Sequence, residues 1–320
     1  MSVKIIAEFY QNHNGDYEIL REMIHQAADA GATYGKIQTI FADDLTYREK
    51  FEKGKIVDDK ITIIKRPYKP EYDRLKTLEL DYEKHYLFIE DCKKYGLKPL
   101  TTAFTRGSIK RIIDLEWDTV KVASYDCGSY PLIEELSNHF KHIIISTGAS
   151  YEEEIYKTAE IMNVKDHAFT FLHCVTVYPT PLEMINLKRM EWLKQFTNSV
   201  GFSDHTLVKR DGVIAALVAI YLGAKFIERH FTILPSDQTK DGPVSIDSGH
   251  IKQLVDFSYL NKDEQKVYLF EKFPNWEILL GSGKLDLSHE ELLNRDYYRG
   301  RFSTQVDHEV IYNWDNTEIS

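Results

Sequence analysis

Two histidines, His205 and His230, stand in the segments GFSDHT (201–206) and FIERHFT (226–232), each after a short apolar run. They lie 25 residues apart, about one strand–helix repeat of an α/β barrel. This spacing predicts that both lie at the same end of two neighbouring strands. Two neutral imidazoles converging there are suited to a divalent metal, with water, a carboxylate or substrate oxygens as further ligands.

Other polar residues also recur where β-rich runs end, which is where a barrel carries its catalytic groups. Ammonium and hydroxyl groups bind phosphate and carboxylate oxygens well. Two lysines, several hydroxyls and a metal therefore predict a phosphorylated or polycarboxylate substrate and a metal-assisted lyase, aldolase or synthase. The strand-end residues are Glu8, Lys36, Gln38, Thr101, Thr102, Lys121, Ser124, Ser146, Thr147, His173, Thr176, Ser203, Asp204 and Glu228.

Each of these residues, taken alone, has a structural alternative. A strand-end lysine or serine is often a solvated or capping residue, and a lone histidine often only forms structural hydrogen bonds. Glu8 could simply pair with Lys36 or Lys121. The convergence of many such groups at one end is what favours a functional site.

The elements that must position these residues are eight β-rich runs with helical patterns between them. They alternate at a spacing of roughly 20–30 residues, which predicts an α/β fold of the (β/α)8 TIM-barrel type. An open doubly wound sheet is the competing interpretation, but no GxGxxG turn follows the first run. The runs are 4–9, 34–40, 97–104, 119–124, 142–147, 168–175, 198–203 and 224–231.

Two segments break the repeat. Residues 41–81 form a charged, Tyr-rich insertion, which we expect to be a long loop over the active face. From about Gly281 the pattern gives way to an acidic, aromatic tail. We therefore predict a barrel over 1–280 and a C-terminal extension over 281–320, too short for an ordinary second domain.

Composition limits the function classes. The net charge of −10 argues against a nucleic-acid partner, and no apolar stretch approaches the ~18 residues of a membrane span. The segment MSVKIIAEFY lacks a signal-peptide layout, and the three cysteines show no CxxC spacing. We expect a cytoplasmic protein.

Several motifs resemble those of the sialic acid synthase family, in the same order along the chain. AEFYQNHNG is similar to the first-strand motif of that family, and seven further segments look like their counterparts. Eight ordered matches are far more specific than any one of them. The segments are 7–15, 36–39, 97–104, 120–133, 143–150, 172–181, 200–206 and 227–232, followed by GSGK at 281–284.

The resemblance implies condensation of phosphoenolpyruvate with an N-acylated aldose such as N-acetylmannosamine, giving a nonulosonic (sialic-type) 2-keto acid and phosphate. It implies that His205 and His230 hold Mn2+ or Mg2+, which polarises the aldehyde. It further implies that Glu8 orients water or moves a proton. The remaining implied catalytic residues are Lys121 and Asp126, and the implied substrate contacts are Lys36, Gln38, Thr102, Ser124, Ser146, Thr176, Tyr178 and Ser203.

The chain departs from the family pattern at the sugar site. Tyr10 replaces a glycine, Asp126 a longer glutamate and Thr176 an asparagine. Val244 stands where a carboxylate is usual, with Asp241 three residues earlier.

Family members also carry an antifreeze-like domain that lends an arginine to the partner's sugar site. Only 294–310 resembles its beginning, which leaves Arg299 and Arg301 as candidates and a homodimer as an open question.

Two alternatives remain open at this point. The first is a phosphoenolpyruvate-dependent synthase that uses a non-acetylated or phosphorylated aldose, with Lys65, Arg66 and Lys69 as candidate phosphate contacts. The second is a non-catalytic barrel subunit of a surface-glycan pathway. Joint retention of Glu8 and the histidine pair argues against that subunit, because the fold alone does not require them.

Overall fold

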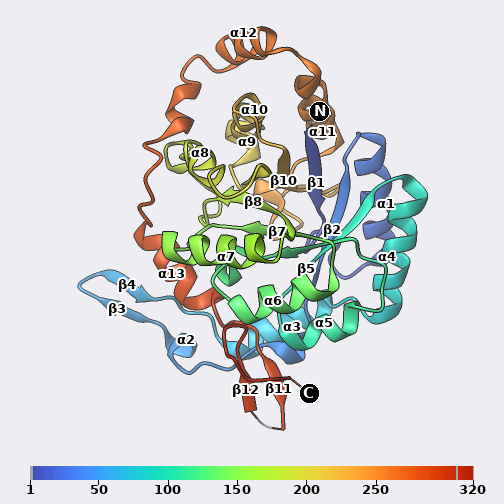
Figure 1. Cartoon of the computed structure of the whole chain (residues 1–320), viewed down its shortest axis with the longest axis vertical. Helices are drawn as coiled ribbons and strands as arrows, with labels where there is room; N and C mark the ends of the chain where they lie inside the picture. Colours follow the sequence, from blue (N-terminus) through green and yellow to red (C-terminus); the bar gives the residue numbers. More distant parts are fainter. Residues whose placement is uncertain (1–2, 308, 320) are drawn as a thin grey trace.

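The computed structural model describes residues 3–307 and 309–319. Residues 1–2 of the predicted barrel and residues 308 and 320 of the predicted extension lie outside the described residues. Eight parallel strands close into a barrel in the order β1-β10-β9-β8-β7-β6-β5-β2 (Figure 1), which confirms the predicted TIM barrel. The strands are β1 (Lys4–Glu8), β2 (Tyr34–Thr39), β5 (Lys98–Ala103), β6 (Thr119–Val122), β7 (His142–Ser146), β8 (Ala168–Cys174), β9 (Val200–Asp204) and β10 (Phe226–His230).

The strands are apolar on both faces because the barrel interior and the helix layer each need packing. In β7, Ile144 packs inside the barrel with Leu100 and Leu172. Its neighbours Ile143 and Ile145 pack outward in the main hydrophobic core. All these side chains are fully buried. This alternation also decides which strand-end residues can reach the interior.

Helices form the outer layer (Figure 1). Asp16 and Asp81 accept hydrogen bonds from the first backbone amides of α1 and α4, which satisfies donors that have no partner within the helix. The helices that follow the barrel strands are α1 (Tyr17–Asp29), α4 (Tyr82–Tyr95), α5 (Arg106–Ile112), α6 (Tyr130–His139), α7 (Glu152–Val164), α8 (Arg189–Leu193), α9 (Val208–Asp211), α10 (Ile214–Tyr221) and α11 (Ser248–Tyr259).

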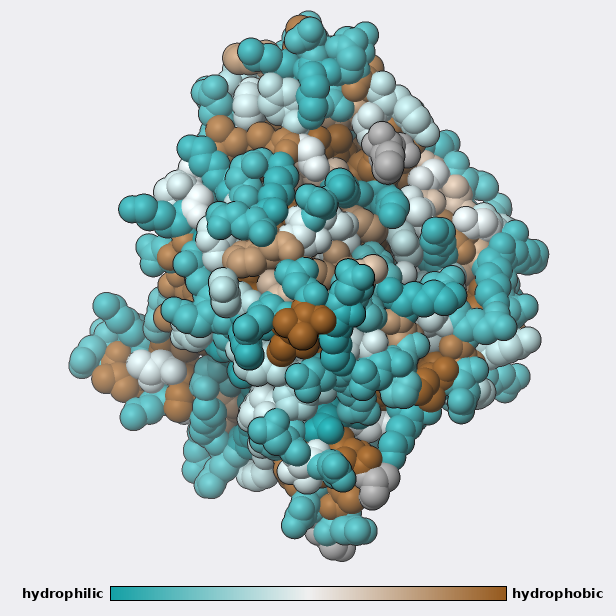
Figure 2. Space-filling model, in the orientation of Figure 1, coloured by the Kyte–Doolittle hydropathy of each residue, from teal (hydrophilic) through white to brown (hydrophobic). Residues whose placement is uncertain are grey.

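The insertion after β2 has secondary structure that the sequence analysis did not predict. It contains α2 (Lys50–Lys53), a hairpin of β3 (Lys55–Val57) and β4 (Lys60–Ile63), and α3 (Tyr68–Leu78). The hairpin projects from the body (Figure 1) and carries an apolar surface (Figure 2). Ile56, Val57 and Ile61 are exposed there.

The C-terminal part continues with α12 (Lys262–Lys272) and then α13 (His289–Tyr298). A small antiparallel hairpin of β11 (Thr304–Val306) and β12 (Glu309–Ile311) follows. The α13 helix lies beside β4, where the His289 ring contacts the Ile61 carbonyl at 2.7 Å. Within residues 3–307 and 309–319, no helix is long and apolar enough to cross a membrane.

Candidate active site

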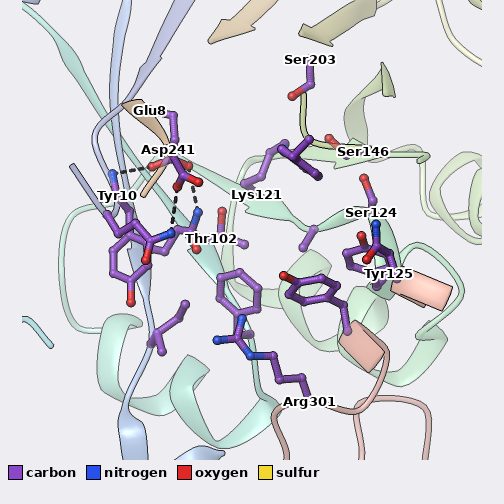
Figure 3. Close-up of a pocket in the computed structure, with 18 of the residues that line it drawn as sticks. Glu8, Tyr10, Thr102, Lys121, Ser124, Tyr125, Ser146, Ser203, Asp241 and Arg301 are labelled. Atoms are coloured by element: carbon purple, nitrogen blue, oxygen red, sulfur yellow. Dashed lines mark hydrogen bonds between the residues drawn. The ribbon is translucent and has the colours of Figure 1, made fainter. Parts of the chain in front are cut away.

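A cavity of about 390 Å³ lies at the carboxyl ends of the barrel strands (Figure 3). Every barrel strand, or the turn directly after it, contributes to its lining, which is the usual place for barrel chemistry. Twelve of the thirteen predicted site residues line it: Glu8, Lys36, Gln38, Thr102, Lys121, Ser124, Asp126, Ser146, Tyr178, Ser203, His205 and His230.

One half of the floor is built around Glu8. Its carboxylate contacts the Lys36 ammonium and accepts hydrogen bonds from the Tyr10 amide at 2.9 Å and from Gln38 Nε2 at 3.2 Å. Lys36 Nζ also donates to Thr102 Oγ1 at 3.2 Å. Both members of the ion pair are 2% exposed, so Glu8 is held in one orientation.

The other half is built around Glu228, a strand-end residue to which the sequence analysis gave no role. Glu228 Oε1 accepts hydrogen bonds from Lys121 Nζ at 3.2 Å and from Ser203 Oγ at 3.3 Å. Lys36 Nζ lies 4.0 Å from Glu228 Oε1 and so links the two halves of the floor. Side chains alternate along β10, so Glu228 faces inward as His230 does. This alternation is the feature of the sequence that could have identified Glu228 as a site residue.

The floor therefore pairs two ammonium groups with two carboxylates, and all four side chains are buried. Burial lowers the pKa of Lys36 to about 7, against the opposing effect of Glu228. Burial alone would raise the pKa of Glu228, but Lys121 and Lys36 hold that pKa below its ordinary value. An incoming anion would favour the protonated form of Lys36.

The two histidines meet as predicted, with ring centroids 5.6 Å apart. Burial lowers the pKa of both His205 and His230, so both imidazoles are neutral near pH 7. The Tyr178 ring packs on His205 at a centroid distance of 4.2 Å. His230 Nδ1 is buried without a hydrogen-bond partner among the described residues.

Asp241 is the acidic group beside this pair. Its Oδ2 accepts a hydrogen bond from Gln11 Nε2 at 3.0 Å and lies 3.7 Å from His230 Nδ1. Asp241 thus provides a carboxylate at the cavity, although Val244 occupies the position at which the family pattern has one. Among the described residues, no group of three or more His, Cys, Asp or Glu side chains is arranged to hold a metal.

One predicted substrate contact is not among the residues that line this cavity. Thr176 does not line the cavity but is fully buried in the wall, where its carbonyl accepts a hydrogen bond from Asn294 Nδ2 at 2.8 Å. Asp126 does line the cavity. Its Oδ1 accepts hydrogen bonds from Ser129 Oγ at 2.8 Å and Asn313 Nδ2 at 3.0 Å, and burial raises its pKa.

The outer wall comes from segments beyond the strands. Arg74 of α3 and Arg301 both line the cavity and share the Glu71 carboxylate between them. Arg301 Nε is buried without a hydrogen-bond partner among the described residues. Tyr298 stacks on Tyr125 with ring centroids 5.1 Å apart and planes at 15°. The sequence carried no signal for Arg74 and Tyr298.

The structure also distinguishes between candidate basic residues that could not be told apart in the sequence. Arg301 lines the cavity, whereas Arg299 does not and is paired with Glu154 at 2.7 Å. Of the three basic residues proposed in the insertion, Arg66 lines the cavity, and Lys65 and Lys69 do not.

Comparisons with known proteins identify relatives of this chain. The model described as the NeuB family matches residues 23–263. A pseudaminic acid synthase of Campylobacter jejuni is 32% identical over 309 residues, which cover 95% of this chain and 82% of that protein. An N,N'-diacetyllegionaminic acid synthase of Legionella pneumophila is 31% identical over 315 residues, with coverages of 96% and 81%.

Solved structures show the same barrel. The N-acetylneuraminic acid (sialic acid) synthetase of Leptospira borgpetersenii in complex with citrate superposes with a TM-score of 0.70 at 26% identity, covering 93% of this chain and 91% of that one. The DAHP synthase of Thermotoga maritima, at 15% identity and a TM-score of 0.58, shares the fold alone. The resemblance predicted from the motifs is confirmed, and this chain belongs to the NeuB family.

Proposed function

We propose that this chain condenses phosphoenolpyruvate with an N-acylated aldose of the N-acetylmannosamine type. The products would be a nonulosonic 2-keto acid and phosphate. The observation that carries the proposal is the convergence of Lys36, Lys121 and the histidine pair on one cavity floor. The relatives named above, which are synthases of pseudaminic and legionaminic acid, support the same reaction class.

The floor suits a substrate with one phosphate and one carboxylate. Lys36 and Lys121 supply two charged donors, and Thr102 and Ser203 supply hydroxyls beside them. Ser146 Oγ is buried without a partner among the described residues, so its hydrogen is available to a substrate oxygen. Charge-assisted hydrogen bonds of this kind fix the orientation of the anion as well as bind it.

The reaction needs one carbon–carbon bond, one water and one leaving group. The terminal enol carbon attacks the aldehyde carbon, and the aldehyde oxygen takes a proton to become a hydroxyl. Water adds to the former C2 of phosphoenolpyruvate, and the tetrahedral carbon then releases phosphate by C–O cleavage to leave the ketone. We assign the removal of the proton from that water to Glu8, which is buried and oriented by hydrogen bonds from the Tyr10 amide and Gln38.

The histidine pair fits a divalent ion in its donor chemistry. His205 and His230 are neutral, and the Nδ1 atom of His230 has no hydrogen-bond partner among residues 3–307 and 309–319. Two imidazoles with Asp241 nearby leave further positions to water and substrate oxygens. When bound, Mn2+ or Mg2+ would draw electron density from the aldehyde and make its carbon a better electrophile.

A phosphorylated aldose is the second candidate acceptor, and one observation favours it. The outer half of the cavity is lined by four cationic groups, Arg66, Arg74, Lys240 and Arg301. Arg74 and Arg301 are paired with Glu71, whereas Lys240 and Arg66 take part in none of the ion pairs found among the described residues. An anion on the far end of the acceptor would meet them directly.

The test is phosphate release from phosphoenolpyruvate with Mn2+ and a panel of aldoses. The panel contains N-acetylmannosamine, diacetamido sugars, non-acetylated sugars and the 6-phosphate of N-acetylmannosamine. Release with an N-acylated sugar in the wild type and its loss in His205→Ala support the proposal, and a preference for the 6-phosphate favours the second candidate. A chain that binds neither Mn2+ nor phosphoenolpyruvate would be the non-catalytic subunit instead.

A further inference from the structure

A buried ion pair lies directly behind the two histidines. Arg229 and Asp204 are paired in register across β10 and β9, and their charged atoms approach to 2.6 Å. Both side chains are 0% exposed. Because side chains alternate along a strand, this pair points toward the helix layer, whereas His205 and His230 line the cavity. Neither charged residue can therefore touch a substrate.

The Arg229 guanidinium also holds two backbone turns at once. It donates to Thr206 Oγ1 at 2.9 Å and to the Thr206 carbonyl at 3.3 Å, one residue beyond His205. The same guanidinium donates to the Val244 carbonyl at 3.2 Å. That carbonyl belongs to the short turn after Asp241. Asp204 Oδ1 in turn accepts a hydrogen bond from the Thr206 amide at 2.9 Å.

We infer that Arg229 is a positioning residue that sets the relative placement of His205, His230 and the Asp241 turn. The inference rests on the proposed role of the two histidines as metal ligands. A planar fork of donors is needed because three acceptors in two different segments must be held together. A lysine could keep the charge opposite Asp204 but could not span both turns.

The pair has a matched control elsewhere in the chain. Arg189 is also buried, at 4% exposure, and it contacts Glu152 at 2.6 Å and the Gly283 carbonyl at 3.2 Å. It lies in α8, before β9, and does not line the cavity. Glu152 is 45% exposed, so the loss of this pair should reduce stability less than the loss of the Arg229 pair, without disturbing the histidines.

The experiment measures Mn2+ affinity by titration with electron paramagnetic resonance detection, without substrate or turnover. Arg229→Met alone leaves a buried carboxylate unpaired, so the main variant is Asp204→Asn/Arg229→Met. It is compared with wild type, His205→Ala and the control Arg189→Met/Glu152→Gln. Arg229→Lys, which keeps the charge but loses the fork, provides a second variant with a smaller effect on folding.

We expect the Mn2+ dissociation constant to rise by about tenfold or more in the Arg229 variants, the range seen when support around metal ligands is removed. The Arg189 control should stay within about twofold of wild type by the same reasoning. An unchanged Mn2+ affinity in the folded Arg229 variants, or an equal loss of affinity in the control, overturns the inference about Arg229 and leaves the proposed function standing. A wild-type chain that binds no Mn2+ overturns the metal part of the proposed function together with it.

Discussion

The outer wall of the cavity depends on how firmly the C-terminal segment is held against the barrel, and Glu154 of α7 is a central anchor. Its Oε1 accepts from Arg295 Nη2 at 2.6 Å and from Arg299 Nη1 at 2.7 Å. Its Oε2 accepts from the Tyr151 amide at 2.9 Å. Replacing Glu154 with Gln keeps the shape but removes the charge that faces two guanidinium groups.

The magnitude follows from those contacts. A hydrogen bond to a charged group contributes about 1.5–3 kcal/mol, and a neutral one about 0.5–1.5 kcal/mol. Loss of charge from two such bonds should therefore cost about 2–3 kcal/mol of docking free energy. That corresponds to a change of about 30- to 150-fold in the equilibrium between docked and undocked segments. Arg301 and Tyr298 would leave the cavity whenever the segment undocks.

Hydrogen exchange over residues 289–306 and Michaelis constants for both substrates provide the assay. We expect faster exchange and a raised KM for the aldose in Glu154→Gln, with little change in the KM for phosphoenolpyruvate. The control is Glu153→Gln, an exposed neighbour on the same helix turn. Unchanged exchange in the variant, or an equal effect on both substrates, would refute the idea that this anchor maintains the acceptor side.

The remaining predictions concern the cavity floor and whether Arg301 lines the cavity of its own chain or that of another copy. Burial lowers the pKa of Lys36 to about 7, so between pH 7 and about 10 the folded chain binds fewer protons there than the unfolded chain. The free energy of unfolding should rise with pH in this window by up to about 1.4 kcal/mol per unit. Urea titrations should show this slope in the wild type and its absence in Lys36→Met/Glu8→Gln. Glu8→Gln alone should lower turnover by about 10²-fold or more, measured as phosphate release, while phosphoenolpyruvate still binds. Mixing the Arg301→Gln and His205→Ala variants should restore no activity, because Arg301 completes the cavity of its own chain. Recovery of activity in the mixture would show that C-terminal segments are exchanged between copies.

The barrel was predictable because its strands have a strong local signature. Parallel strands buried on both faces form short apolar runs such as 142–147, and helices of regular length separate them. The hairpin in the insertion was not predicted for a local reason. Asp58 and Asp59 occupy its turn with φ values of 47° and 60°, without the glycine that usually marks such turns. Its apolar side chains are exposed, so they give no buried face to detect.

The floor of the site was predictable for a geometric reason, and the wall was not. Once parallel strands are assigned, their carboxyl ends must converge, and alternation selects the residues that face inward. Thr176, which does not line the cavity, lies two residues beyond the end of β8 and so outside the strand in which alternation decides which way a side chain faces. Arg74 and Arg301 lie in segments placed only by tertiary contacts such as their shared Glu71.

The floor and the wall of the cavity differ in how far their residues can change without disturbing the barrel. The floor is fixed by strands whose inward residues also close the barrel interior, so a change there disturbs the fold and the proposed phosphoenolpyruvate site together. The wall consists of the insertion and the C-terminal segment, which contact each other through Arg48 and the backbone carbonyls of Asp296, Tyr297 and Arg299. Substitutions in these segments can reshape the acceptor side while the floor stays intact. The departures of this chain at Tyr10, Asp126 and Val244 lie in the turns beyond β1, β6 and β10, which is where that reasoning places them.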